Sequence, residues 1–247
     1  MSRKIYIILL ALVLALGMTG QAAAGMEGMK HEGHEMMMHH VHIMMNHGLS
    51  MVTEGSNMAM LAQMEMTPSL DPMTLKHGRS MIADGKAVIQ RSLSGPEMMG
   101  MHEAGTTPET DPQMKYTHDL GEAMFKVVDI LEKMSMEGMT SPDMMAMHHM
   151  HILLNHALDM YLEGSNMVML GQMGMSGSVD DFSIEHGKMM MKNARALYTE
   201  VMEGKEMMKM HKGGMAPEKD PHMMETHKLA ESILKVMDLL DKMPAMK

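Results

Sequence analysis

Apolar residues in this chain recur every three or four positions, which is the spacing of one face of an α-helix. In the first half of the chain the pattern predicts three long helices, at residues 35–66, 71–102 and 112–134. Gly55 and Gly95 interrupt the first two and can kink or split them. Asp71-Pro72 and Asp111-Pro112 resemble an N-cap followed by proline at the first helical position. No segment alternates as strands do, so we expect an all-helical fold.

The second half of the chain repeats the first, with residue 39 corresponding to residue 148 and no gap up to residues 134 and 243. His39-His40-Val41-His42-Ile43 returns as His148-His149-Met150-His151-Ile152. This pattern predicts a tandem duplication of a three-helix, or with a split helix four-helix, bundle unit. We expect repeats at 36–134 and 144–247 with a linker at 135–143. Residues 25–35, rich in Met and His, lack apolar periodicity and are expected to be a disordered tail.

The third helix of each repeat has an unambiguous apolar stripe. In the first repeat it consists of Leu120, Met124, Val127, Leu131 and Met134, and in the second of Leu229, Ile233, Val236, Leu240 and Met243. Met124 is replaced by Ile233, so methionine serves there as a hydrophobic residue. We expect about half of the methionines to be core residues of this kind.

The composition indicates what the other methionines do. Of 247 residues, 46 are methionine, 17 are histidine and none is cysteine. Thioether sulfur is a soft neutral ligand that suits Cu(I), and imidazole binds both Cu(I) and Cu(II). The formal net charge of −10 favours cations and argues against a nucleic-acid partner.

The first 24 residues have the pattern of a signal peptide. Arg3 and Lys4 precede an apolar run, residues 5–16, that is too short to span a membrane comfortably, and Ala22-Ala23-Ala24 offers a cleavage site. We therefore expect a periplasmic protein without a stable membrane anchor; an uncleaved N-terminal anchor is the alternative. In an oxidising compartment thioethers do not form disulfides, so methionine suits a soft-metal protein there.

A stripe on the first helix combines apolar residues with metal ligands. It comprises His40, Ile43, Met44, His47, Met51, Glu54, Met58 and Leu61, answered in the second repeat by His149, Ile152, Leu153, His156, Met160, Glu163, Met167 and Leu170. The apolar members predict that this is the buried side. On the second helix His77 and Met81, with their copies His186 and Met190, are neighbours one turn apart.

These two helices are expected to pack with their ligands facing one another. His47, Met51, Glu54, His77 and Met81 would form a mixed nitrogen and sulfur site inside the bundle, with a copy at His156, Met160, Glu163, His186 and Met190. Glu54 would orient a histidine rather than bind the metal. The alternative is that these residues are ordinary hydrogen-bonded polar residues of the core.

Two further groups of ligands are predicted outside this site. Met114 and His118, with Met223 and His227 in the second copy, point about 160° away from the leucine stripe and are exposed unless another helix covers them. The tract Glu-Met-Met-x-Met-His is expected to be an exposed collector of Cu(I) or Ag(I). Its ligands are Met98, Met99, Met101 and His102 in the first repeat and Met207, Met208, Met210 and His211 in the second.

The signal peptide, the lack of cysteine and tracts such as Met36-Met37-Met38-His39-His40 resemble the Met/His-rich periplasmic copper- and silver-binding proteins of metal-resistance systems. The resemblance implies sequestration or transfer of monovalent metal. It rests on composition and short tracts and matches no folded domain. The long duplicated helices differ from the small, largely disordered members of that group.

We therefore expect a non-enzymatic protein that binds copper, chiefly Cu(I) with Cu(II) or Ag(I) as alternatives, for storage, buffering or delivery. Its partners would be metal ions and a periplasmic copper chaperone, exporter or oxidase. One alternative is a ferritin-like metallo-oxidase around Glu54, His77 and Glu122, although the chain lacks the Glu-x-x-His signature of di-iron carboxylate proteins. Another is a metal-free protein whose methionines consume oxidants by cycling through the sulfoxide.

Overall fold

The computed structural model describes residues 29–65, 67–135 and 142–243. The predicted signal peptide and the start of the predicted tail lie outside these residues. The chain divides into two compact units, Met1–Glu35 and Met36–Lys247, and both repeats lie in the second unit.

The prediction of an all-helical fold is confirmed, since the described ranges contain helices and turns and no strand. The first repeat contributes α2 (Met29–Gln63), α3 (Asp71–Ser94), α4 (Pro96–Glu103) and α5 (Pro112–Met134). The second contributes α6 (Pro142–Gln172), α7 (Ser178–Glu203), α8 (Lys205–Lys212) and α9 (Pro221–Leu240). Residues 29–35, expected to be disordered, are helical in α2, and α6 begins at Pro142, inside the expected linker.

Only one of the two candidate glycine breaks is used in the first repeat. Gly95 adopts an extended conformation between α3 and α4, and Pro96 starts the new helix. Gly55 remains inside α2, where it contacts α3. Each repeat in the described ranges is thus the four-helix variant of the predicted unit.

The helix caps agree with the prediction at one of the two Asp-Pro sites. Asp111 caps α5 by accepting hydrogen bonds from the backbone N–H groups of Gln113 and Met114. Asp71 instead lies within the first turn of α3, and its carboxylate accepts hydrogen bonds from Thr67. The difference arises because the preceding turn is itself helical, so Leu70 occupies the cap position.

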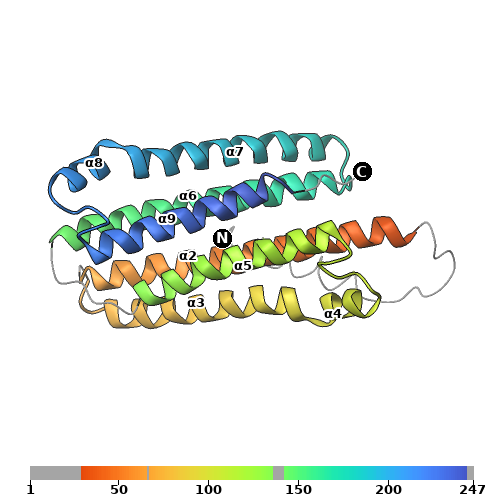
Figure 1. Cartoon of the computed structure of the whole chain (residues 1–247), viewed down its shortest axis with the longest axis horizontal. Helices are drawn as coiled ribbons and strands as arrows, with labels where there is room; N and C mark the ends of the chain where they lie inside the picture. The colour runs from red at the N-terminus through yellow and green to blue at the C-terminus, as the bar shows by residue number, and fades with distance from the viewer. Residues whose placement is uncertain (1–28, 66, 136–141, 244–247) are drawn as a thin grey trace. The chain divides into compact units, whose positions relative to one another are not determined.

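Four helices form the centre of the unit Met36–Lys247, and two others cover them. Hydrogen bonds join α2 to α5 and α6, α6 to α9, and α5 to α9. α3 packs outside against α2 and α5, and α7 packs outside against α6. The resulting order of layers, α3, then α2 with α5, then α6 with α9, then α7, can be followed in Figure 1. We call α2, α5, α6 and α9 the inner bundle.

The inner bundle pairs equivalent residues of the two repeats reciprocally. Asn46 of the first repeat donates to Asn166 of the second at 2.8 Å, and Asn155 of the second donates to Asn57 of the first at 2.8 Å. Asn46 corresponds to Asn155, and Asn57 to Asn166, in the sequence repeat. The two repeats therefore face one another across an approximate two-fold relation, as expected for a duplicated unit.

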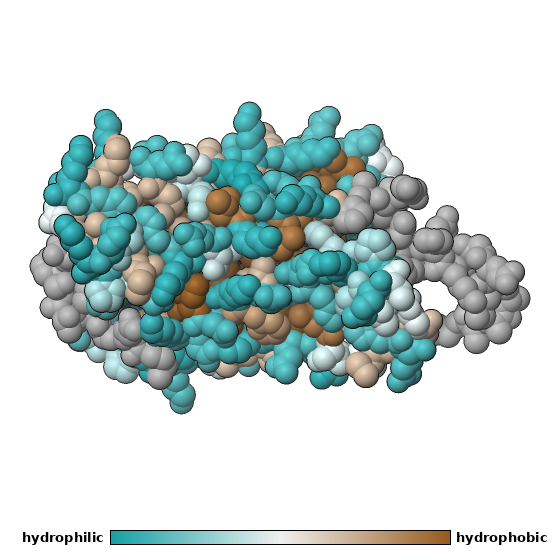
Figure 2. All heavy atoms as spheres, in the orientation of Figure 1, coloured by the Kyte–Doolittle hydropathy of each residue, from teal (hydrophilic) through white to brown (hydrophobic). Residues whose placement is uncertain are grey.

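Methionines occur both in the interior and on the surface. Figure 2 shows hydrophilic side chains over most of one face of the protein, with apolar atoms visible between them. Exposed methionines include Met73, Met99, Met175, Met189 and Met208, whereas Met38, Met45, Met60, Met114 and Met124 are fully buried. None of the described helices is long and apolar enough to span a bilayer.

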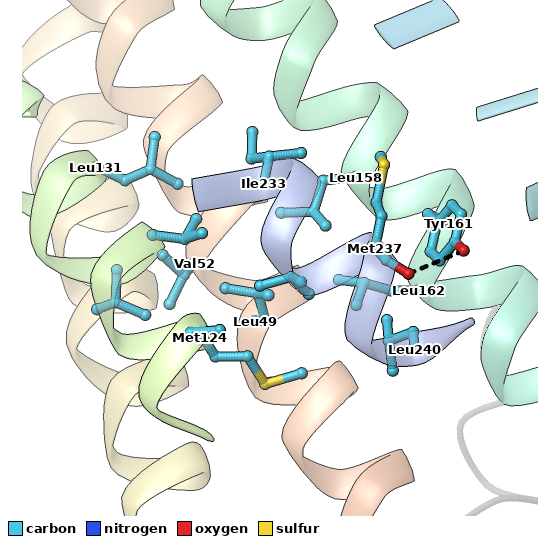
Figure 3. Packing of buried hydrophobic residues seen from close by; sticks show 14 of the residues in the cluster. Leu49, Val52, Met124, Leu131, Leu158, Tyr161, Leu162, Ile233, Met237 and Leu240 are labelled. Atoms are coloured by element: carbon cyan, nitrogen blue, oxygen red, sulfur yellow. Dashed lines mark hydrogen bonds between the residues drawn. The ribbon is translucent and has the colours of Figure 1, made fainter. Parts of the chain in front are cut away.

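The predicted third-helix stripe forms much of the core. Leu120, Met124, Val127, Leu131 and Met134 are all buried, as are Leu229, Ile233, Val236 and Leu240, while Met243 is partly exposed. Figure 3 shows several of these side chains packed against Leu49 and Leu158 from the inner face of α2 and α6. One continuous hydrophobic cluster contains residues of both repeats.

Candidate metal centre

Two histidines meet where α4 folds back on α5. The Nε2 atoms of His102 and His118 lie 3.4 Å apart, and their rings are inclined by only 22°. The second repeat reproduces this pair at the junction of α8 and α9. There the Nε2 atoms of His211 and His227 lie 3.2 Å apart, with the rings inclined by 25°.

The local sequence explains why these side chains converge. Gly95 and Pro96 break the outer helix, so that α4 turns as a separate short segment. Gly105, with φ of 90°, then reverses the chain, and Asp111 caps α5. Such a positive φ is accessible to glycine at little cost. Gly214, the counterpart of Gly105, has φ of 101°.

The separation of the facing nitrogens suits a shared metal ion. Both contacts are within reach of an N–H···N hydrogen bond, although the commonest separation for N–H···O bonds is shorter, about 2.9–3.0 Å. Imidazole–metal bonds are about 2.0–2.1 Å long for zinc, and a tetrahedral angle then separates two such nitrogens by about 3.3–3.4 Å. Both pairs are close to this value, so a small ion could bind between them with little movement.

Buried thioethers lie one turn along each helix from the histidines. Met98 precedes His102 by four residues on α4, and Met114 precedes His118 by four residues on α5, so each pair shares a helix face. Met98 and Met114 are fully buried, as are their counterparts Met207 and Met223. The residues present thus offer two nitrogens facing each other and sulfurs on the buried side.

The surroundings of His118 and His227 favour their neutral forms. Burial lowers the pKa of His118, and the neighbouring His102 lowers it further, while Glu109 acts in the opposite direction. Burial and His211 likewise lower the pKa of His227, and Glu218 and Glu231 oppose them. A neutral imidazole has the lone pair that a metal requires, so the lowered pKa values of His118 and His227 favour metal binding by these two residues.

In the described ranges no group of three or more His, Cys, Asp or Glu side chains could hold a metal ion. Each histidine pair thus depends on ligands of another kind to complete a coordination shell. The thioethers of Met98 and Met114, and of their counterparts, lie one helical turn from the histidines and are soft donors available to each pair. This donor set of nitrogen and sulfur favours Cu(I) over harder divalent ions.

The structure brings together two motifs that the sequence presented separately. The tract 97–102 was expected to be exposed, but Met98 and Met101 are buried because α4 packs beside α5. His118 and His227, expected to be exposed unless another helix covers them, are half-buried beneath α4 and α8. Met99 and Met208 are exposed, as expected, and Met210 is half-buried.

The predicted interior site between α2 and α3 is wrong in its placement. His47, Glu54 and His77 are exposed, and so are His40 and Leu61 on the same predicted stripe. In the second repeat His149, His156, Glu163 and Leu170 are exposed and His186 is half-buried. The methionines of this set are half-buried: Met51, Met58, Met81, Met160, Met167 and Met190. Metal binding by these residues in another arrangement stays a prediction.

The glycines at the contact between α2 and α3 explain why the predicted interior site is misplaced. α2 and α3 approach through Gly48 and Gly55 on one side and Gly78 and Gly85 on the other. His47 and Glu54 each precede a contact glycine by one residue, so their side chains point to the side of the helix–helix contact rather than into it. The methionines flank the contact, since a Cβ built on Gly55 would lie 2.9 Å from the Cβ of Met81.

Three buried histidines, His42, His148 and His151, were not predicted as metal ligands, and His39 appeared only within the N-terminal Met/His-rich tract. His39, His42, His148 and His151 are all buried on the inner faces of α2 and α6. The feature of the sequence that could have predicted these buried histidines is the His-x-x-His spacing. It recurs in both repeats, on the same helix face as the buried Asn46 and Asn155. The neighbouring His40 and His149, which the sequence predicts as metal ligands, are exposed to solvent.

Comparison of the chain with protein-family models, curated proteins and solved structures finds no match.

Proposed function

We propose that this protein binds Cu(I) at two equivalent sites, His102 with His118 and His211 with His227, and that it stores, buffers or delivers the ion. The observation that carries the proposal is the pair of facing Nε2 atoms, which recurs in both repeats at 3.4 and 3.2 Å. Histidines scattered on a surface would not be expected to keep the same paired geometry in both copies of the sequence.

The thioethers support Cu(I) rather than Zn(II). Zinc sites are built from thiolate, imidazole and carboxylate, whereas neutral sulfur suits soft monovalent ions. Met98 and Met114 have a packing role as well, because both belong to the hydrophobic core. Ag(I) is expected to occupy the same sites because it is also a soft monovalent ion.

Storage, buffering and delivery require no chemical transformation, so the proposal describes a binding protein and not an enzyme. The half-buried histidines leave one side of each pair open to solvent, which allows the ion to enter and leave. The signal-peptide pattern of residues 1–24 supports a periplasmic location, where a copper chaperone, exporter or oxidase would be the partner.

The test is an anaerobic titration with Cu(I) against a competing chelator. Replacing His102 and His118 by alanine should remove one tightly bound ion, and replacing His211 and His227 as well should remove a second. The matched control replaces the exposed pair His47 and His77, which should leave both of these ions in place. An unchanged Cu(I) count in the four-histidine variant would overturn the proposal.

A second set of variants tests the role of sulfur. Met98→Leu with Met114→Leu keeps the apolar volume and removes both thioethers of the first repeat. We expect weaker Cu(I) binding in that repeat and unchanged Zn(II) binding. Equal losses for both metals would mean that the methionines contribute only to packing.

A further inference from the structure

The inner faces of α2 and α6 carry a row of buried polar atoms that find no hydrogen-bond partner among the described residues. On α2 these atoms include Nδ1 of His39, Nδ1 of His42 and Oδ1 of Asn46, and on α6 they include Nδ1 of His151 and Oδ1 of Asn155. An unpartnered buried polar atom costs free energy, on the order of 1–3 kcal/mol. The recurrence of such atoms at equivalent positions indicates that something satisfies them.

The hydrogen bonds of the first repeat establish which ring nitrogen of His42 carries the proton. His42 Nε2 lies 2.7 Å from the hydroxyl oxygen of Thr117, and that hydroxyl donates its own proton to the Gln113 carbonyl oxygen at 2.9 Å. Thr117 can therefore only accept from His42. Nε2 is the protonated nitrogen, and Nδ1 presents a bare lone pair to the interior.

The same reasoning holds for the second repeat. His151 Nε2 lies 2.7 Å from the hydroxyl of Thr226, whose proton goes to the carbonyl oxygen of His222 at 2.9 Å. His148 Nε2 lies 3.2 Å from Oε1 of Gln63, and the amide nitrogen of Gln63 donates to the carbonyl oxygen of Ser135. His148 must also donate from Nε2, so its Nδ1 is likewise unprotonated.

His39 completes the pair in the first repeat. Its Nε2 lies 3.3 Å from Oε1 of Gln172, the counterpart of Gln63, so Nδ1 is again the unprotonated nitrogen. His39 and His42 are three residues apart on one face of α2, with ring centroids 6.4 Å apart. His148 and His151 have the same spacing on α6, with centroids 6.0 Å apart.

Apart from the hydroxyls of Ser56 and Ser165, these unpartnered atoms are imidazole nitrogens and amide oxygens that act as acceptors, and such a set of acceptors suits a cation. All these ligands are neutral, which favours a monovalent ion, because a divalent ion in the interior would need carboxylates to balance its charge. Met38 and Met45 flank the histidines on α2 and are fully buried, so soft donors are present in the same region. Imidazole nitrogen with thioether sulfur again selects Cu(I) or Ag(I).

We infer that the inner bundle holds a second class of soft monovalent cation site, formed in the first repeat by the Nδ1 atoms of His39 and His42. The equivalent site of the second repeat is formed by the Nδ1 atoms of His148 and His151. The inference extends the proposed copper function from the two surface pairs to an interior reservoir of Cu(I) or Ag(I).

The position of Met114 connects the interior site with the surface pair. On α5, Met114 lies three residues before Thr117, the partner of His42, and four residues before His118, a ligand of the surface pair. At about 100° per residue its buried side chain lies angularly between the two. Met223 has the same relation to Thr226 and His227. A buried thioether thus lies between the two kinds of site on α5 and on α9.

The test uses the 247-residue chain with His102, His118, His211 and His227 replaced by alanine, so that the surface pairs cannot bind. Histidines are labelled with ¹⁵N, and Ag(I), which is diamagnetic and redox-inert under these conditions, is added anaerobically. We expect the first equivalents to shift the Nδ1 resonances of His39 and His42 and of His148 and His151. The exposed neighbours His40 and His149 serve as internal controls and should not shift at this stage.

A second variant separates binding from folding. In His42→Gln the side-chain amide can still donate to Thr117, so the hydrogen bond that holds α2 to α5 is kept while one Nδ1 is lost. We expect this variant, with the surface histidines also replaced, to lose the Ag(I) response of His39 while its helical circular dichroism is retained.

The two proposals fail in different ways. If Ag(I) leaves the four interior Nδ1 resonances unchanged in the surface-deficient chain, the interior atoms bind water and the inference is overturned. If the wild-type chain shows the interior shifts but none at His102, His118, His211 and His227, the proposed surface sites are overturned while the interior sites stand.

Discussion

Asp159 is a carboxyl group placed between α6 and α2, and its surroundings favour the protonated form. Its Oδ1 lies 2.5 Å from the hydroxyl oxygen of Thr53, which also lies 2.8 Å from the carbonyl oxygen of Ser50. Thr53 has a single proton to give. If the proton goes to Ser50, a protonated Asp159 can donate to Thr53, and both contacts are satisfied.

Burial raises the pKa of Asp159 to about 7, with the hydroxyls of Thr53 and Ser50 opposing the rise and Glu54 and Glu163 adding to it. Asp159→Asn keeps the shape and removes the cost of ionisation. We expect the variant to be more stable than wild type by about 1–3 kcal/mol at pH 8, with the difference vanishing near pH 4. Urea unfolding at the two pH values measures it. A variant that is less stable at pH 8 would show that ionised Asp159 is stabilising.

The interior histidines give the metal-free protein a second dependence on pH. Burial lowers the pKa of His42 to about 3, with His39 contributing, and burial lowers that of His151 to about 3, with His148 and His222 contributing. Both are neutral in the folded state and gain protons on unfolding below pH 6.5. Stability is therefore complete above about pH 6.5 and falls as the pH is lowered toward 3.

Asp159 acts in the opposite sense, because between about pH 4 and 7 the folded state holds its proton and the unfolded state does not. For these three groups alone the net uptake on unfolding is one proton, or about 1.4 kcal/mol per pH unit, and the lowered pKa values of His118, His148 and His227 add to it. In Asp159→Asn the slope should steepen by about 1.4 kcal/mol per pH unit, because the opposing proton is removed. Urea unfolding from pH 7 to pH 5 with a chelator present measures both slopes. A wild-type stability that rises on acidification would contradict the lowered pKa values of His42 and His151.

Single residues were the hardest feature to predict from the sequence. The Met-x-x-x-His pairs at Met98 and Met114 were recognisable, because four-residue spacing places two ligands on one helix face. Their meeting depends on the reversal at Gly105, which no periodic pattern encodes. The buried His39 and His42 were missed because a polar stripe in a bundle interior has no hydrophobic signal, and its partners are hydroxyls and amides distant in sequence.

Helices α2 and α3 pack through close backbone contacts at glycines, with side chains beside them. A Cβ built on Gly55 would lie 2.5 Å from the carbonyl oxygen of Gly78, and one built on Gly85 would lie 2.4 Å from that of Gly48. Such distances are not tolerated, so alanine at these positions must push the helices apart. Gly164 and Gly187 repeat the contact between α6 and α7.

Gly55→Ala should therefore destabilise the protein by about 1–3 kcal/mol, although alanine favours a helix interior by about 1 kcal/mol. Gly100→Ala is the matched control, because Gly100 is also helical and a Cβ there would meet nothing within 4 Å. The control should be neutral or slightly stabilising. Thermal unfolding followed by circular dichroism compares the two. Equal stability of both variants would show that the helices separate without cost.

Element boundaries and faces were predictable to different degrees. The stripe of α5 and the cap at Asp111 could be predicted because Leu, Val and Asp-Pro each have a single common role there. The face of α2 could not, because methionine is equally frequent on both sides and the contact residues are glycines. Where the hydrophobic pattern is built from Met and Gly, a helix can be predicted but its orientation cannot.

At the scale of the whole unit, the two repeats share one core, so they should unfold together. Leu49 and Leu158 are equivalent residues of the two repeats, and both are fully buried in that core. Leu49→Ala and Leu158→Ala should each cost about 2–5 kcal/mol and lower the midpoint of the same transition. Differential scanning calorimetry should show a single peak in wild type and in each variant. Two resolved peaks, each sensitive to one substitution, would show that the repeats are independent domains.

The reciprocal asparagine bonds between α2 and α6 also bear on how this architecture arose. An isologous interface is one in which the same patch of two identical chains meets itself, and the bonds Asn46–Asn166 and Asn155–Asn57 have that form. A single ancestral copy of this unit would carry both halves of each bond and could complete the inner bundle by pairing with a second molecule. Fusion of the two copies makes their association independent of concentration. It also allows the two sides to differ, since Asp159 lies opposite Thr53 whereas the equivalent positions of the reciprocal contact hold Ser50 and Leu162.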